Sequence, residues 1–372
     1  VSIFNLSKKI LLESVKLRMR SDVPIAFCLS GGIDSGFLVS CAKKVFNQEI
    51  SSFSIIDKDQ RYNEQNNIEL ISNDLGIASN LIHLHNDKKI FFERLKMLTE
   101  YHDGPIATLS YYIHSFLSEN ISKSGYKVAI SGTGADELFT GYYDHFLLQL
   151  EAIKDTSFFK KNLDDWKKFI NPILRNEFLK DPYLYINDPL NRDSVYEKKF
   201  NIQKYSKIKY NFEFKENTYC NELLRNRMLN EMFNEVVPVI LKHDDLNSMY
   251  YSVENRSPYL DRNLLNFSLT IPPHLLISDG YQKKVLREAS SDVLNEKILN
   301  DRTKKGFNAS INSIVDLNDK DVIKYILDKK SEISEFVNLN FLEKELNQNE
   351  IPNHISKFLF SILSTKFFLE SF

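Results

Sequence analysis

The chain has 372 residues, of which 42% are hydrophobic, and its basic and acidic residues nearly balance at a formal net charge of -2. A chain of this size can bury a large core in one large domain or in two lobes. The balanced charge argues against nucleic acid as the main partner, because nonspecific binding to phosphates requires a basic surface. No segment reaches the ~20 apolar residues of a membrane span, and no signal peptide is evident. We therefore expect a cytoplasmic protein without a nucleic-acid or membrane partner.

The cysteine pattern points away from redox or metal chemistry. The three cysteines, Cys28, Cys41 and Cys220, form no C-x-x-C pair. Two of them lie in apolar segments, so we expect buried, reduced thiols.

The first part of the chain alternates helical and strand patterns. An amphipathic helix over residues 6–19 precedes strands expected at 24–28, 51–56, 81–85 and 127–130, with helices between them, one of which ends at Gly76. This order predicts a parallel sheet whose ligands gather at the carboxyl ends of the strands. His83 and His85 alternate on a predicted strand, but no third metal ligand follows at a suitable spacing.

The turn after the first strand, Leu29–Gly36, is rich in glycine and serine. A strand, a glycine-rich turn and a helix together present free backbone amides and a helix dipole to an anion. Ser30 and Ser35 add hydroxyl donors. Asp34 would repel a phosphate directly, so we expect it to hold a magnesium ion that binds the phosphate oxygens.

A second glycine-rich turn, SGTGADELFTGY at 131–142, follows the fourth strand. If that strand lies beside the first, Asp136 approaches Asp34, and the two carboxylates can share magnesium beside a triphosphate. A helix N-terminus contributes only ~0.3 to 1 kcal/mol per charge, which cannot neutralise ATP without a divalent cation. The alternative is that Asp136 and Glu137 merely cap the next helix.

These motifs carry a family resemblance. The string SGGIDS at 30–35 resembles the pyrophosphate-binding loop of the ATP pyrophosphatases, and the two turns together resemble the synthetase domain of the asparagine synthetase family. Residues 244–261, KKVLRE at 283–288 and RTKKGF at 302–307 are similar to further signatures of that family, so the resemblance covers most of the chain.

The resemblance implies an α/β fold, a Rossmann-like parallel sheet of the adenine nucleotide alpha-hydrolase type, with a large helical C-terminal portion. It suggests one synthetase domain made of a nucleotide-binding lobe at 1–150, a variable insertion at 151–215 and a mostly helical lobe at 216–372 that completes the active site.

The same resemblance implies an AMP-forming ligase that uses ATP and Mg²⁺. A carboxylate attacks the α phosphate of ATP, giving an acyl-adenylate and pyrophosphate, and ammonia or an amine then displaces AMP. The metal ligands would be Asp34 and Asp136. The residues expected to bind ATP and pyrophosphate are Leu29, Ser30, Gly31, Gly32, Asp34, Ser35, Ser54, Ser131 and Gly132.

Two lysines inside the matching motifs resemble the family's catalytic lysines. Lys283 would balance the charge of the leaving pyrophosphate, and Lys304 would stabilise the tetrahedral oxyanion of the second step. A unit charge pair at about 4 Å is worth ~4 kcal/mol at an effective dielectric near 20. We expect their neighbours Lys284 and Lys305 to be solvated.

Four further residues are candidates on the substrate side, namely Glu137, Tyr142, Glu254 and Arg256. The last two are predicted to lie in a turn bounded by serine and proline. There they could equally form a structural ion pair.

The chain departs from the family pattern at Thr133, where asparagine synthetases carry an acidic residue and β-lactam-forming relatives a tyrosine. Threonine cannot act as a general base near neutral pH, so Thr133 leaves the base unassigned. Its presence favours a carboxylate other than aspartate as substrate.

The source of nitrogen is also open, because glutamine-using family members have a preceding glutaminase domain and this chain begins almost at the synthetase helix. Free ammonia, an amine substrate, a separate glutaminase subunit or a removed domain could each supply it. A homodimer is a further expectation.

Two other functions remain possible. An RNA-modifying enzyme with the same loop predicts a basic patch or catalytic cysteines, against which the composition argues. A noncatalytic nucleotide-binding subunit predicts that no carboxylate supports exchange of label between ATP and pyrophosphate.

Overall fold

A five-stranded parallel sheet takes four strands from the first 130 residues and its fifth from residues 254–256, with strand order β3-β2-β1-β4-β5. The computed structural model describes residues 2–192, 204–208, 215–303, 309–347, 351 and 353–371. The strands are β1 (Ile25–Cys28), β2 (Ser51–Ile56), β3 (Ala78–His83), β4 (Val128–Ile130) and β5 (Glu254–Arg256). The predicted α/β class and its parallel sheet are confirmed.

The register of the sheet brings the two glycine-rich turns together. Ala26 of β1 pairs with Ser51 of β2 on one side and with Ala129 of β4 on the other. The first and fourth strands are therefore neighbours, and the turns that follow them open at the same edge of the sheet, as the sequence required for a joint site.

One strand differs from the sequence prediction. Glu254–Arg256 pairs in parallel with β4, with Ile130 opposite Arg256, so this segment is a strand and not the predicted turn. It lies at the edge of the sheet and carries polar side chains, which gave it no apolar signature.

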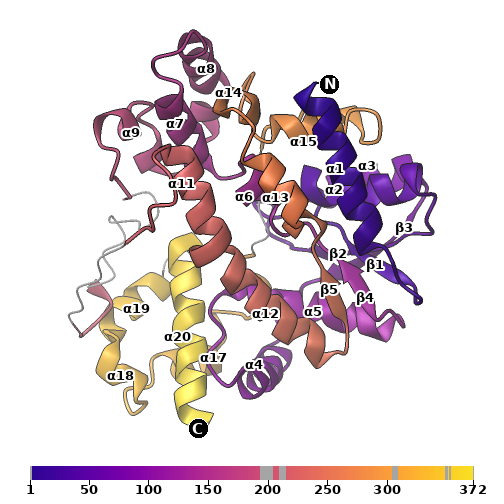
Figure 1. The fold of residues 1–372 in the computed structure, drawn as a ribbon. Helices are drawn as coiled ribbons and strands as arrows, with labels where there is room; N and C mark the ends of the chain where they lie inside the picture. The colour runs from indigo at the N-terminus through magenta and orange to yellow at the C-terminus, as the bar shows by residue number, and fades with distance from the viewer. Residues whose placement is uncertain are drawn as a thin grey trace.

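Helices cover both faces of the sheet (Figure 1). Phe27 packs into a cluster with α1 (Ile3–Arg18) and α2 (Ile33–Ser40), and Ala26 faces the other way, into a cluster with α5 (Leu109–Lys123). The remaining helices among the first 130 residues are α3 (Gln65–Leu75) and α4 (Lys88–His102). The predicted left-handed cap at Gly76 ends α3, with φ at 60°.

The rest of the chain is mostly helical. The α-helices that the structure describes there are α6 (Ala135–Phe139), α7 (Tyr143–Ala152), α8 (Phe159–Asp165), α9 (Leu184–Asn187), α11 (Leu223–Asn230), α12 (Val237–Tyr250), α13 (Arg262–Ser268), α14 (Pro273–Leu276), α15 (Lys284–Ala289), α16 (Glu296–Leu299), α17 (Lys320–Ile326), α18 (Ile333–Phe336), α19 (Leu339–Leu346) and α20 (Asn353–Ser371). Pro238 sits in the first turn of α12, after the π-helical turn η6 (Glu231–Glu235) that follows α11. None of the described helices combines the length and apolar character that crossing a lipid bilayer demands.

Residues 163–185 of the predicted insertion 151–215 pack into the main core, and Tyr205 packs into a second cluster. Leu163, Trp166 and Tyr185 are buried in the same hydrophobic cluster as α2, the helix that follows the first glycine-rich turn. The second cluster joins α4 and α5 to the C-terminal helices through residues such as Phe91, Tyr112 and Phe360.

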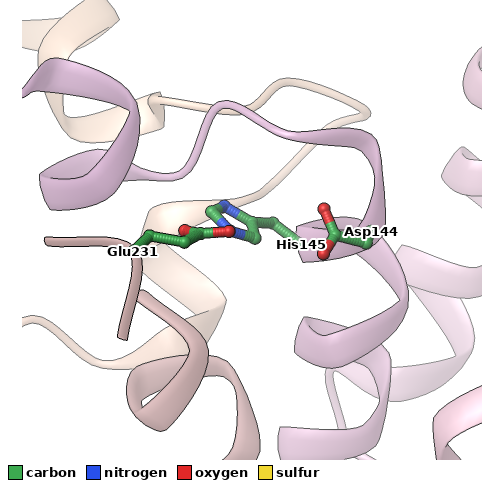
Figure 2. A group of neighbouring side chains, drawn as sticks. All are labelled: Asp144, His145 and Glu231. Atoms are coloured by element: carbon green, nitrogen blue, oxygen red, sulfur yellow. The ribbon is translucent and has the colours of Figure 1, made fainter. Parts of the chain in front are cut away.

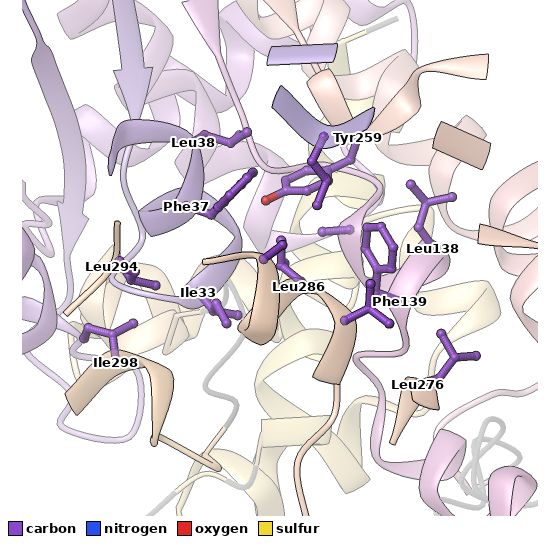
Figure 3. Packing of buried hydrophobic residues seen from close by; sticks show 14 of the residues in the cluster. Ile33, Phe37, Leu38, Leu138, Phe139, Tyr259, Leu276, Leu286, Leu294 and Ile298 are labelled. Atoms are coloured by element: carbon purple, nitrogen blue, oxygen red, sulfur yellow. The ribbon is translucent and has the colours of Figure 1, made fainter. Parts of the chain in front are cut away.

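The helices that follow the two glycine-rich turns are packed against each other (Figure 3). Phe37 of α2, Phe139 of α6 and Leu286 of α15 are fully buried in one cluster with Tyr259. The Tyr259 hydroxyl also donates a hydrogen bond to the backbone oxygen of Asp34 at 2.9 Å. Apolar packing therefore fixes the relative positions of the two turns and of the helix beside Lys283.

Gly134 combines a left-handed backbone with a close neighbouring side chain in the second turn. Its φ is 96°, and an added Cβ would lie 2.4 Å from Leu260 Cδ2. We predict that Gly134→Ala lowers the free energy of unfolding by about 2 to 4 kcal/mol, because backbone strain and overpacking add. Chemical denaturation measures this loss.

Gly125 offers a matched control, since its φ is 88° and an added Cβ would meet nothing within 4 Å. Gly125→Ala should cost only the strain, about 1 kcal/mol. Equal losses for the two variants would contradict a packing requirement at Gly134.

Candidate active site

A cavity of about 300 Å³ lies at the carboxyl edge of the sheet. Both glycine-rich turns contribute to its wall. The predicted site residues that line it are Leu29, Ser30, Gly32, Asp34, Ser35, Ser131, Gly132, Thr133, Asp136 and Lys283. The structure therefore brings together residues that are 249 positions apart in the chain.

The first turn is organised by its two serines. The backbone amide of Ser30 donates to the Ser35 hydroxyl at 3.1 Å, and the two hydroxyls are 3.1 Å apart. Gly32 is the N-cap of α2, with no side chain capping that end. Backbone and hydroxyl donors thus surround a helix N-terminus at the cavity wall, which is an arrangement suited to an anion.

The Lys283 ammonium lies between the two aspartates. Its Nζ is 2.5 Å from Asp34 Oδ2 and 2.5 Å from Asp136 Oδ1. The Lys283 side chain is only 7% exposed. Burial alone disfavours the ammonium, but the two carboxylates outweigh it and raise the pKa of Lys283 above its ordinary value. The lysine is therefore charged at neutral pH.

Lys283 also has an unusual backbone. Its φ is 55°, in the left-handed region, and its amide donates to the Thr140 hydroxyl at 3.4 Å. A left-handed residue other than glycine costs roughly 1 to 2 kcal/mol. The surrounding structure holds this conformation, and it directs the side chain to the carboxylates.

The second turn is tied to the edge strand. The Ser131 amide donates to the Arg256 carbonyl at 2.9 Å, and the Ser131 hydroxyl is 3.3 Å from that of Ser257. Thr133, which lines the cavity, has its hydroxyl 3.4 Å from the Ser131 hydroxyl.

Six predicted residues do not line the cavity, namely Gly31, Ser54, Glu137, Tyr142, Glu254 and Arg256. Arg256 pairs with Glu254 at 2.8 Å and donates to the carbonyls of Arg18 and Arg20. This is the structural ion pair that the sequence allowed as one alternative. Ser54 is buried in β2.

Glu137 and Tyr142 form a buried pair behind the second turn. The tyrosine hydroxyl donates to Glu137 Oε1 at 2.6 Å. Burial, and secondly the charge of Asp136, raise the pKa of Glu137 to about 7. Glu137 thus takes up or releases a proton near neutral pH.

In a second polar group on the cavity wall, Asp244 begins the quoted motif at 244–261, but no motif contains its partner His114. His114 of α5 and Asp244 of α12 both line the cavity, with His114 Nδ1 2.6 Å from Asp244 Oδ1. Cys28 also lines the cavity, but burial raises its pKa to about 12, so its thiol is not a nucleophile at neutral pH.

Two arginines from quoted motifs complete the wall. Arg287 donates to the carbonyls of Gln282 and Leu299, and Arg302 stacks over Tyr281 at 3.8 Å. Both line the cavity. Both arginines lie in motifs quoted from the sequence, but neither was assigned a role on the basis of the sequence.

Lys304 lies outside the described residues. The chain reaches the cavity wall at Thr303. Beyond the undescribed residues, the Ser310 amide donates at 3.2 Å to Asp57, which also lines the cavity. The flanks on both sides of Lys304 thus contact the site.

The site residues fit a magnesium ion by their chemistry. Asp34 and Asp136 offer hard carboxylate oxygens, which Mg²⁺ prefers, and both oxygens contact one ammonium, so they are close enough to contact one cation.

Titration of Glu137 should be visible in the stability of the protein. Because its native pKa of about 7 is above the ordinary 4.5, the folded state keeps a proton that the unfolded chain loses. The contribution of Glu137 to the free energy of unfolding is fully present below about pH 4.5, and it is lost as the pH rises through about 7. The cost at pH 8 is up to about 3 kcal/mol.

We predict that Glu137→Gln removes this dependence. The wild type should lose stability relative to the variant between pH 4.5 and pH 8, as measured by denaturant titration at each pH. A constant difference between the two proteins across this range would contradict the raised pKa.

Comparison with known proteins agrees with the geometry. The sequence profile of the Asparagine synthase family matches residues 7–366. Asparagine synthetase [glutamine-hydrolyzing] 1 of Bacillus subtilis is 28% identical over 79% of this chain and 48% of its own length. Amidase chyE of Penicillium rubens is 30% identical over 40% of this chain and 24% of its own length.

Asparagine synthetase [glutamine-hydrolyzing] 2 of B. subtilis is 25% identical over 77% of this chain and 36% of its own length. The chain thus spans half or less of the length of these relatives. The family match extends over nearly all of the 372 residues. On this match and on the sheet topology, the chain belongs to the asparagine synthase family.

Proposed function

We propose that the chain is the synthetase part of an AMP-forming carbon–nitrogen ligase, which activates a carboxylate with ATP and then forms an amide. The observation that carries this proposal is the Lys283 ammonium between Asp34 and Asp136, in a cavity walled by both glycine-rich turns. The names of the relatives, asparagine synthetases and an amidase, agree with amide chemistry.

In the first step a carboxylate oxygen of the substrate attacks the α phosphorus of ATP. The bond from that phosphorus to the bridging oxygen breaks, and pyrophosphate leaves with the electron pair. Ser30, Ser35 and the backbone at Gly32 donate hydrogen bonds to it, and Lys283 balances its growing charge. Mg²⁺ held by Asp34 and Asp136 would supply further positive charge for the phosphates.

Lys283 thus has two roles, one before ATP binds and one after. Without nucleotide its ammonium compensates the two aspartates. Asp34 and Asp136 would hold Mg²⁺ when ATP is bound, and the Lys283 ammonium would then be available to the phosphates. The three charges are then paired in both states.

In the second step an amine or ammonia attacks the acyl carbon of the adenylate, and AMP leaves with the oxygen that came from the carboxylate. Lys304 would stabilise the tetrahedral oxyanion. Its position in the chain supports this role, because Thr303 before this segment lines the cavity, and Ser310 after it bonds Asp57 of the cavity wall.

The attacking amine must lose a proton, and Thr133 cannot accept it. We assign this role to His114. A neutral imidazole that donates its Nδ1 proton to Asp244 presents Nε2 as the base, and Asp244 stabilises the imidazolium that forms. A substrate carboxylate other than aspartate agrees with Thr133. The nitrogen comes from ammonia or an amine, supplied directly or by a glutaminase domain or subunit.

Lys304 and its neighbour Lys305 provide a matched test. We expect Lys304→Ala to lower the rate of amide formation by about 100-fold or more, because one oxyanion partner is lost. Lys305→Ala should stay within about threefold. Candidate carboxylates with ammonia are assayed for pyrophosphate, AMP and amide.

ADP as the product would overturn the proposal. Absence of label exchange between pyrophosphate and ATP with every carboxylate would favour a noncatalytic subunit. Adenylation of an RNA would favour an RNA-modifying enzyme.

His114→Gln tests the base. We expect amide formation to fall by about 100-fold near neutral pH and to recover partly at high pH, where the amine is already deprotonated. The exchange of pyrophosphate into ATP, which needs no such base, should change little. An equal loss of both activities would contradict the assignment.

A further inference from the structure

A buried cluster of polar side chains lies directly behind the second glycine-rich turn. Asp144 and His145 come from α7 and Glu231 from the π-helical turn η6 (Figure 2). The His145 side chain is 0% exposed and that of Glu231 is 2% exposed. Ligand atoms of the three residues lie within 4.8 Å of one another, a grouping that could hold a metal ion.

The hydrogen bonds of His145 favour a different role. The backbone amide of Gly141 donates to His145 Nδ1 at 3.3 Å, which fixes the ring proton on Nε2. Nε2 then donates to Glu231 Oε2 at 2.9 Å. Both ring nitrogens are engaged, so no lone pair is left for a metal ion.

The positive charge in this cluster is supplied by Arg227. Its Nε lies 3.1 Å from Glu231 Oε1 and 3.9 Å from Asp144 Oδ2. Its Nη1 also contacts Glu216 and Glu235. The Arg227 guanidinium balances the charge of these carboxylates, so they need no metal ion to do so. It also holds Glu231 in position.

Gly141 connects the cluster to the candidate active site. A Cβ added at Gly141 would lie 1.7 Å from Asp136 Oδ1, so the Asp136 carboxylate rests against the Gly141 backbone. The residue before it, Thr140, has φ at 68° and accepts a hydrogen bond from the Lys283 amide. The turn at 140–141 therefore touches both Asp136 and Lys283.

We propose that His145, held by Glu231 and Arg227, is a positioning residue that fixes Gly141 and thereby aims the Asp136 carboxylate at the divalent cation of ATP. This inference rests on the proposed function, because it assumes that Asp136 binds metal. His145 touches neither substrate nor metal, and it acts only through the Gly141 amide.

The test uses variants that keep one or other of the two ring contacts. Asn in place of His145 keeps an acceptor near the Nδ1 position, for Gly141. Gln keeps a group near the Nε2 position, for Glu231, and Leu keeps neither. Binding of Mn²⁺ in the presence of ATP is measured by electron paramagnetic resonance, and thermal unfolding is followed in parallel.

We expect His145→Asn to keep the Mn²⁺ dissociation constant within about threefold of the wild type. His145→Gln and His145→Leu should raise it about 10- to 100-fold, the range seen when partners of metal ligands are removed. Gln149→Leu is the control for destabilisation, since Gln149 is buried one turn further along α7 and bonds the Ile277 carbonyl at 3.2 Å.

The outcomes separate the two proposals. If the wild type binds no Mn²⁺ with ATP, the proposed function itself fails. If the wild type binds but all three His145 variants bind equally well, or if Gln149→Leu weakens binding as much as His145→Leu, the cluster is only structural and this inference is overturned.

Discussion

Two carboxylates, Asp34 and Asp136, meet at one edge of the sheet, and their mutual repulsion is the constraint on which the site depends. The buried ammonium of Lys283 offsets this repulsion, because it contacts both carboxylates. Removing one partner of such a group leaves an uncompensated charge, which typically costs about 3 to 5 kcal/mol. The strained backbone of Lys283, the apolar packing of α2, α6 and α15, and the Tyr259 hydrogen bond all serve to hold these three side chains together.

Around this centre the structure separates tasks between layers. The glycine-rich turns supply donors at the cavity, the apolar helix faces fix their distance, and the Arg227 network behind the second turn holds its backbone. His114 and Asp244 on the cavity wall are the groups to which we assign the proton transfer that Thr133 cannot provide. A site of this kind is also sensitive to changes at residues that touch no ligand, because they determine where the ligand-contacting groups point.

Local patterns in the sequence predicted much of this arrangement. Apolar runs followed by glycine marked β1 and β4 and the turns that carry Asp34 and Asp136, and the KKVLRE motif at 283–288 marked Lys283. The strand β5 was not predicted, because its polar residues form a strand only by pairing with β4. His114 escaped for a related reason, since it lies on a helix among Tyr111, Tyr112 and Ile113, where nothing local marks a cavity. Contacts made across long separations leave no periodic signal.

The parallel pairing of β4 with β5 has a consequence for how this chain matures. The edge strand is translated more than a hundred residues after β4, and the Lys283 that neutralises the carboxylates comes 249 residues after Asp34. A nascent chain that has emerged beyond β4 but not yet to β5 would expose the unpaired edge of β4. Assembly dominated by such distant contacts is slow, and the sheet and its buried charges are complete only when the last third of the polypeptide has been made.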